Sequence, residues 1–223
     1  TRLYQLTYAA DPYEAKRKFF SLFEDIFAVN NDGGKDITFK DISELHTLIY
    51  ENMFGNYQTL VKRVLSNNGG RGDYAAGKFL DLFNQNDPKR PNENYARELL
   101  QLFLMGEYKP HESKENNDVR NYEESDVLAL AKILTGLRSD PMTHAISFDM
   151  NMHYSGSALP FLTGAISMDP PYYNAASGSI DPIAILNPLN SNNGLADNTI
   201  EYIFAKRSDA IALFLSDRIV RFY

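Results

Sequence analysis

The chain has 223 residues, of which 43% are hydrophobic, so it has ample apolar side chains for a buried core. Its 22 Lys and Arg residues against 29 Asp and Glu residues give a net charge of -7, spread along the chain, which disfavours a nucleic-acid partner. Cysteine is absent, which excludes disulfides, thiolate metal sites and a cysteine nucleophile.

Helical periodicity of apolar residues dominates the first two thirds of the chain. It predicts helices near residues 12–28, 40–54, 56–66, 73–84, 93–105 and 123–135. Connectors rich in Asn and Gly, or in Asn and Pro, separate these helices at residues 30–34, 67–70 and 86–88. Asn56 and Asp73 are expected to cap the helices that follow them.

From about Ser139 to Gly194 the helical pattern is lost, and Pro, Gly, Ser and Asn become frequent. We expect a long irregular segment with at most a short hairpin, formed by residues 145–148 and 161–166. Helices return at about 196–205 and 209–223, with Ser208 as the cap of the second. The predicted fold class is all-α: a multi-helix bundle with a loop-rich segment at about 139–194.

We expect residues 1–223 to form a single helical domain. The last predicted helix ends at Tyr223 without Gly, Pro or a polar tail, so we expect truncation at the C-terminus and leave truncation before Thr1 open. No apolar run approaches the roughly 20 residues of a membrane span. The first residues also show no charged-then-apolar export signal.

The densest polar chemistry lies at the start of the predicted helix 93–105. Asn92 is expected to cap this helix, with Glu93 at the positive end of its dipole, and Gly106 is expected to end it in a left-handed conformation. Tyr95 belongs to one of two apolar lines along the helix, which leaves Asn94 and the charged residues that follow on the opposite side.

Two accounts of this polar cluster remain open. In the structural account, Glu93 and Arg97 form an ion pair one helical turn apart, or Glu98 or Asp126 holds a buried Arg97. In the functional account, Glu93 or Glu98 is a general acid or base, or a hard-cation ligand beside the neighbouring asparagines, and Arg97 clamps an anion.

A second motif follows this helix. Asp126 stands in the first turn of its helix, where capping and catalysis are both open interpretations. Thr135 and Gly136 mark the end of that helix, with Gly136 in the left-handed position. His153 is a further candidate from the irregular segment. His46 is expected to pack, and the two histidines at positions 111 and 144 show no partner pattern.

These motifs carry a family resemblance. The residues concerned are Asn92–Leu100, Leu102, Phe103, Gly106, Tyr122, Asp126, Val127, Ala131 and Leu134–Gly136. Together they resemble the signature of a large bacterial family, the domain of unknown function numbered 1800. The resemblance implies a mostly helical, exported protein about twice this long, without an established activity.

Members of that family often carry Trp-His-Asn-His before a Phe-Ala-Val element. The matching stretch here is Phe23–Ile26, with Glu24 and Asp25 and no histidine. A metal or catalytic role of those histidines would therefore be lost, or taken over by carboxylates. At His153, where relatives commonly show a His-Asp pair, Tyr154 replaces the acid.

We therefore expect a non-enzymatic accessory or scaffolding domain that binds a protein or glycan partner in the periplasm or at the cell surface. The abundance of Tyr and Asn favours adaptable contacts of this kind. The alternative is a hydrolase or a metal-dependent enzyme. Its candidate residues are Glu93, Arg97, Glu98, Asp126 and His153, beside a structural motif of Asn92, Asn94, Tyr95, Thr135 and Gly136. No cofactor is assigned, and metal binding is left open.

Overall fold

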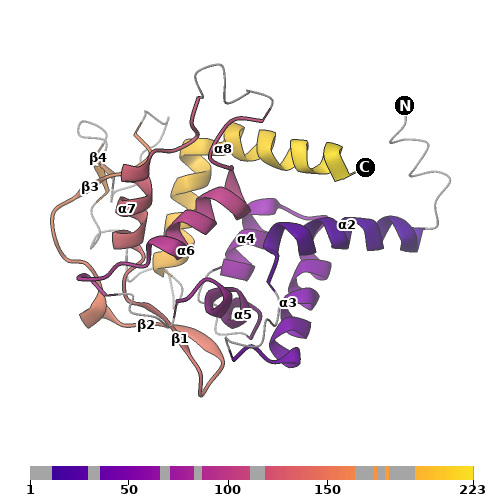
Figure 1. The fold of residues 1–223 in the computed structure, drawn as a ribbon, viewed down its shortest axis with the longest axis horizontal. Coiled ribbons are helices and arrows are strands. Elements are labelled where there is room, and N and C mark those ends of the chain that lie inside the picture. The colour runs from indigo at the N-terminus through magenta and orange to yellow at the C-terminus, as the bar shows by residue number, and fades with distance from the viewer. Residues whose placement is uncertain are drawn as a thin grey trace.

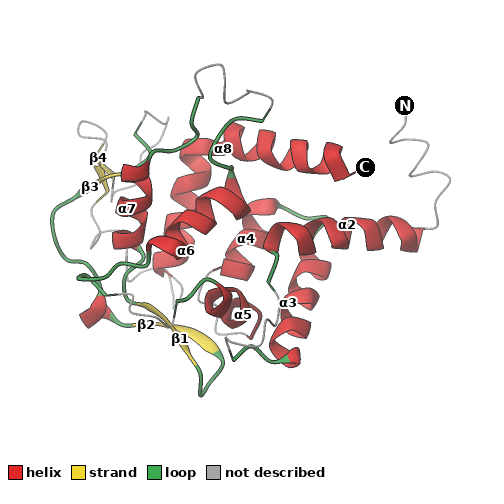
Figure 2. Cartoon of the chain, viewed as in Figure 1, coloured by secondary structure: helices red, strands yellow, loops and turns green. Residues whose placement is uncertain are grey.

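The computed structural model describes residues 12–29, 36–65, 71–82, 87–110, 119–163, 173–174, 179–180 and 194–222. Its α-helices are α2 (Pro12–Phe27), α3 (Phe39–Asn52), α4 (Tyr57–Leu65), α5 (Arg71–Phe79), α6 (Glu93–Glu98), α7 (Glu124–Ile133) and α8 (Gly194–Phe222). A π-helix, η1 (Leu99–Leu104), continues α6, and a short 3-10 helix, η2, spans Met150–Met152. The all-α prediction is confirmed, since strands are few and short (Figure 2).

Most helix boundaries lie within a few residues of those predicted. The Asn56 side chain accepts a hydrogen bond from the backbone N–H of Thr59 at 3.1 Å, as expected of a cap. Asp73 was expected to precede its helix, but it lies inside α5, which begins at Arg71. The connectors at 30–34 and 67–70 lie outside the described residues.

The predicted helix 93–105 changes from α to π geometry after Glu98. The backbone N–H groups of Met105 and Gly106 both bond to the carbonyl of Leu100, at 2.9 and 3.2 Å, which closes the wider turn. Gly106 has φ +69° and ends the helix in the left-handed conformation, as predicted. Asn121 completes this end by donating to the carbonyls of Met105 and Gly106 at 2.8 and 3.2 Å.

The predicted hairpin has one correct strand and a different partner. Strand β2 (Ala145–Phe148) pairs antiparallel with β1 (Leu137–Asp140), with Leu137 opposite Phe148. The prediction of 161–166 as partner is wrong: 161–163 are not in a strand, and 164–166 lie outside the described residues. β1 follows Gly136 directly, so a four-residue turn suffices to bring β2 beside it, closed by Asp140 accepting the N–H of Met142 at 2.8 Å.

A second small sheet consists of three two-residue strands. These are β3 (Leu159–Pro160), β4 (Tyr173–Asn174) and β5 (Ser179–Ile180), in the order β3-β5-β4. Both neighbouring pairs are antiparallel. The segment predicted to be irregular, about 139–194, therefore contains most of the β1–β2 hairpin and this small sheet.

The last helix, α8, spans Gly194–Phe222 and has a kink inside it. Arg207 has non-helical angles, φ -135° and ψ 26°, and divides α8 where the sequence predicts a break between two helices. Figure 1 shows α8 in yellow, and this helix contacts both α4 and α2. No helix in the described part of the chain is long and apolar enough to cross a membrane.

The core is built from helix faces joined by buried tyrosine hydroxyls. α3 packs against α5, and α6 packs against α7. Phe27 of α2 stacks on Phe103 of η1 with ring centroids 5.5 Å apart. The hydroxyl of Tyr95 donates to the carbonyl of Leu65 at 2.8 Å, which ties α6 to the end of α4.

Candidate functional site

The polar motif that opens α6 begins with a helix cap. Asn92 Oδ1 accepts the backbone N–H of Tyr95 at 2.9 Å, as predicted. Its Nδ2 donates to the carbonyls of Leu80 and Asp81, at 3.3 and 3.0 Å, just after α5. Asn92 therefore satisfies backbone groups of α6 and of the turn after α5 at once, which gives it a structural role.

Arg97 takes its partner from α7. Its Nη1 and Nη2 donate to Glu124 Oε2 and Oε1 at 2.8 and 2.6 Å, in a two-pronged pair. The expected partners of Arg97 were Glu93, Glu98 or Asp126. The observed partner is Glu124, so these expected ion pairs are wrong. The hydrogen bond to Arg97 lowers the pKa of Glu124, and the same bond raises the pKa of Arg97. Both side chains remain well exposed, so the pair lies on the surface.

The remaining polar residues of the motif point largely to solvent. Glu93 and Asn94 are exposed, and Glu98 is half-buried beside Tyr122. Burial raises the pKa of the Tyr122 phenol to about 12, and the carboxylates of Glu107 and Glu98 add to the rise. Of the groups that open this helix, Asn92 and Arg97 thus meet partners from other segments, whereas Glu93 and Asn94 do not turn inward.

Asp126 is buried and bonded to two backbone N–H groups. Its Oδ2 accepts from Glu123 at 2.9 Å, completing a capping box at the start of α7. Its Oδ1 accepts from Leu162 at 2.7 Å, where the backbone has a positive φ of 45°. Both oxygens are therefore used to hold the chain, and capping is the interpretation that these contacts favour.

His153 belongs to a second group of contacts around the end of α7. Its side chain is 4% exposed, and its Nδ1 lies 2.7 Å from the carbonyl oxygen of Thr135. The Thr135 hydroxyl donates to Lys132 and accepts the N–H of Tyr154 at 2.8 Å. Gly136 has φ +90°, and a Cβ there would lie 2.7 Å from the carbonyl oxygen of Asp149, so only glycine fits.

The contacts described for the five candidate catalytic residues do not join them to one another. Arg97 binds Glu124 on the surface, Asp126 binds backbone N–H groups, and His153 binds a backbone carbonyl. Glu93 is exposed and Glu98 is half-buried. Their assignment as catalytic groups stays a prediction, while the contacts of Asp126 and His153 account for both residues structurally.

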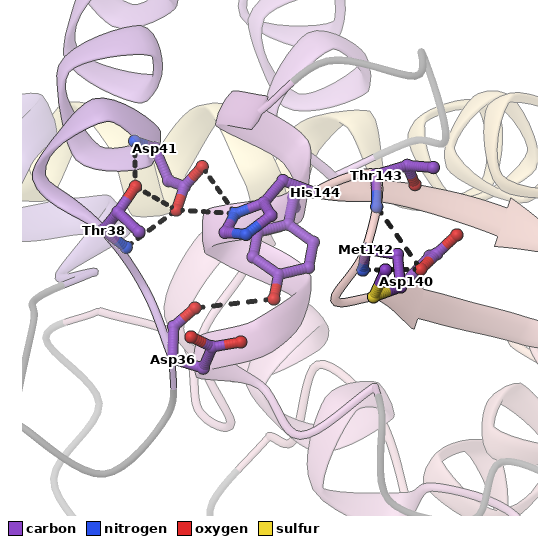
Figure 3. Close-up of polar contacts among 8 residues, drawn as sticks. Asp36, Thr38, Asp41, Asp140, Met142, Thr143 and His144 are labelled. Atoms are coloured by element: carbon purple, nitrogen blue, oxygen red, sulfur yellow. Dashed lines mark hydrogen bonds and ion pairs between the residues drawn. The ribbon is translucent and has the colours of Figure 1, made fainter.

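The structure joins two residues that the sequence analysis did not connect. His144 Nδ1 lies 3.0 Å from both carboxylate oxygens of Asp41, which has no exposed surface (Figure 3). Asp41 also forms a capping box with Thr38 at the start of α3. The His144 ring lies against the buried Tyr74 ring, with centroids 4.6 Å apart. The Thr38–Asp41 spacing was a readable capping signal, but nothing in the sequence pointed to His144.

A hollowed apolar surface lies along α2 and α3. It comprises a cavity of about 340 Å³ and a wider depression of about 630 Å³. We call this surface the α2–α3 groove and define it by Phe20, Glu24, Phe39, Ile42, His46 and Tyr50. Phe39 is 84% exposed, which is unusual for a residue of this size and marks a potential binding surface.

The groove contains Glu24, one of the two carboxylates in the stretch Phe23–Ile26. Glu24 Oε1 lies 3.4 Å from His46 Nε2, so the carboxylate pairs with an imidazole from the facing helix. His46 also packs edge-on against Phe20, with centroids 5.4 Å apart, in keeping with its predicted packing role. Asp25 is exposed. No cluster of three or more potential metal ligands occurs among the described residues, and His111 lies outside them.

The helical fold and these contacts define an all-α protein in which Asn92, Asp126 and His153 bond to backbone groups of the framework. Over residues 2–223 the chain matches the family described as protein of unknown function (DUF1800). The chain belongs to this family, which confirms the resemblance read from its helix motifs. Neither the curated proteins nor the solved structures provide a match to this chain.

Proposed function

We propose that this chain is a non-enzymatic accessory or scaffolding domain of an exported bacterial protein, and that it binds its partner through the α2–α3 groove. The observation that carries the proposal is the exposure of Phe39, at 84%, beside two connected depressions. Exposed aromatic side chains next to apolar hollows are typical of interaction surfaces.

The lining of the groove favours a protein partner over a glycan. Ile42 and Phe39 offer aliphatic and aromatic surface, while Glu24 and His46 already pair with each other. A glycan site would need more polar groups directed at sugar hydroxyls. An apolar side chain of a protein partner fits the available chemistry better.

The competing function is a hydrolase or a metal-dependent enzyme that uses Glu93, Arg97, Glu98, Asp126 and His153. The contacts of these residues give it less support, because both carboxylate oxygens of Asp126 accept backbone N–H groups and Nδ1 of His153 lies on a backbone carbonyl. A general base must come within hydrogen-bond reach of its substrate, and both of these residues are buried.

Photo-crosslinking in a bacterial host tests the proposal. A photoreactive amino acid would replace Phe39 in one strain and Met142 in a second, since Met142 is 90% exposed on the β1–β2 turn. We expect a discrete protein adduct from position 39 and none from position 142, in the periplasmic or cell-surface fraction. Identical adduct patterns from both positions, or none from either, would contradict a protein-binding groove.

A further inference from the structure

The α2–α3 groove runs along one face of α3. This face forms a wall of the groove with residues three or four positions apart: Phe39, Ile42, His46 and Tyr50. At about 1.5 Å per residue, the wall is roughly 16 Å long, which corresponds to about three helical turns. The cavity and the wider depression share Phe39, Ile42 and His46, so they adjoin along this face.

The surroundings of the groove favour a helical occupant over an extended one. Its described lining comes from α2, α3 and the residues adjoining them, and none of the described strands contributes to it. An extended segment would find no strand edge there to pair with its backbone N–H and C=O groups. A helix satisfies its own backbone and presents apolar side chains at positions i, i+4 and i+7, which suit a face about three turns long.

Glu51 determines the charge that this occupant must carry. It lines the wider depression directly after Tyr50, is exposed, and forms no ion pair within the described residues. The other carboxylate of the lining, Glu24, already lies 3.4 Å from His46 Nε2. A partner that covers Glu51 removes water from an ionised carboxylate, which is costly unless the partner supplies a hydrogen-bond donor. A lysine or arginine beside the apolar stripe of the partner provides this donor.

The described lining of the groove contains no lysine or arginine that could supply the donor. Lys16 and Lys40 are exposed on α2 and α3 but line neither the cavity nor the depression. Undescribed residues 30–35, which follow the α2 wall in the chain, include one aspartate and one lysine. The need for a cation therefore comes from the position of Glu51 in the wall and not from a sum of charges. A second copy of this chain docked groove to groove fits poorly, because its lining offers carboxylates to a carboxylate.

We propose that the partner segment in the α2–α3 groove is an amphipathic helix whose apolar stripe is bordered by a lysine or arginine, which pairs with Glu51. This assignment rests on the proposed function, since it names the chemistry of the segment that docks there. The apolar stripe covers Phe39 and Ile42, and the cation lies at the Tyr50 end of the groove. Apolar contact supplies most of the affinity, while the cation selects the partner and fixes the direction in which its helix lies.

Fluorescence anisotropy with three labelled synthetic peptides tests this chemistry at neutral pH and constant ionic strength. Each peptide is a helix of alanine and glutamine with leucine at positions i, i+4 and i+7, and with lysine, glutamine or glutamate one turn beyond each end of the stripe. We expect the lysine peptide to bind about tenfold tighter than the glutamate peptide, with the glutamine peptide between them. Equal affinities would overturn the inference and leave the groove as a binding surface. Absence of binding by all three would overturn it as well, whereas crosslinking at position 39 decides independently whether the groove binds a protein.

Charge variants test the place at which the cation binds. Glu51→Gln is expected to reduce the preference for the lysine peptide over the glutamate peptide to less than about threefold, and Glu51→Lys is expected to reverse it. Asp25→Asn is the matched control, since it removes the same charge from an exposed position outside the groove lining. It therefore measures the general attraction of a chain with net charge -7 for a cationic peptide. Phe39→Ala should weaken all three peptides alike. Equal effects of Glu51→Gln and Asp25→Asn on the preference would refute the assignment of Glu51.

Discussion

The partly buried His144 pairs with the buried Asp41, with Nδ1 of the imidazole 3.0 Å from both carboxylate oxygens, although the residues are 103 positions apart. The same carboxylate accepts hydrogen bonds from the backbone N–H and the hydroxyl of Thr38, at 2.7 and 2.6 Å. The pair thus fastens the β1–β2 turn to the first turn of α3. A carboxylate without exposed surface depends on such partners, because an unpaired buried charge is costly.

Replacing His144 is expected to destabilise the fold markedly. In His144→Ala the buried carboxylate of Asp41 loses its imidazole partner, while alanine keeps the same backbone strain at φ +53°. We expect the free energy of unfolding to fall by about 2–3 kcal/mol, because two hydrogen bonds from Thr38 still satisfy part of the carboxylate. Urea unfolding monitored by circular dichroism measures this change.

Met142→Ala provides the control within the same turn. Met142 is 90% exposed, so its replacement is expected to change the free energy of unfolding by less than about 0.5 kcal/mol. Equal effects of the two substitutions would show that the pair of His144 and Asp41 makes no specific contribution to stability.

Features set by residues close in sequence were predicted correctly, whereas features set by residues far apart in sequence were not. The helices were predictable because apolar spacing and caps such as Asn56 and Asn92 are local signals. The strand at 145–148 was also visible, but its partner was not. Pairing depends on the turn at residues 141–144 and on the positive φ of Gly136 before β1, which periodicity does not encode.

In the candidate site, too, partners that lie far apart in the sequence could not be predicted. The motif at 92–98 was found from sequence, yet Arg97 pairs with Glu124, on another helix, which no spacing rule indicated. His144 appeared partnerless because its partner stands 103 positions earlier. The α2–α3 groove also escaped notice, because an amphipathic pattern does not distinguish a buried aromatic ring from an exposed one such as Phe39.

Asp126 offers a test between a structural and a catalytic role. Asp126→Ala leaves the backbone N–H groups of Glu123 and Leu162 without their acceptor, so we expect about 2–3 kcal/mol less stability. Asp126→Asn keeps one acceptor oxygen and should lose about half as much. Chemical denaturation measures both variants, with the exposed Ser125→Ala as control. Stability equal to that of the parent chain would leave catalysis as the better explanation of this residue.

Gly136 is expected to tolerate no side chain. Its φ of +90° is unfavourable for other residues, and a Cβ would lie 2.7 Å from the carbonyl oxygen of Asp149. Gly136→Ala is therefore expected to cost roughly 2–4 kcal/mol, combining backbone strain with a clash against main chain. Thermal unfolding measures the loss. Gly55→Ala is the matched control, since a Cβ there meets its nearest neighbour at 3.2 Å and should cost clearly less.

The pair of Arg97 and Glu124 gives a small pH-dependent contribution to stability. The hydrogen bond from Arg97 lowers the pKa of Glu124, so the folded state favours the ionised carboxylate. The contribution is full above the ordinary carboxyl pKa and is lost as the pH falls through the lowered value. We expect Glu124→Gln to lower the melting temperature by less than about 2 °C at pH 7, because the pair is exposed.

The difference between Glu124→Gln and the parent chain should disappear in acid, which calorimetry at pH 7 and pH 3 measures. Arg97 stays charged over this whole range, so its raised pKa adds no further pH dependence. A difference that grew on acidification would contradict the assigned direction of the Glu124 pKa.

Phe39 provides the sharpest test of the proposed binding surface. Its ring is 84% exposed, so Phe39→Ala removes almost no buried contact and should change the free energy of unfolding by less than about 0.5 kcal/mol. Partner binding should nevertheless be strongly reduced, because a large aromatic side chain in a groove typically contributes more than 1 kcal/mol to an interface. Capture of the crosslinked partner by the two forms of the protein measures this reduction.

Phe54→Ala is the matched control for that experiment. Phe54 is 59% exposed and lies outside the α2–α3 groove, with its ring centroid 5.1 Å from that of Phe19. Its replacement therefore removes the same kind of side chain at a different place. We expect Phe54→Ala to retain the partner at the level of the parent chain. Because both substitutions remove one exposed phenyl ring, any general effect of surface hydrophobicity affects them alike. Equal loss of the partner in both variants would therefore remove the groove as the binding site, whereas loss in Phe39→Ala alone would place the contact between α2 and α3.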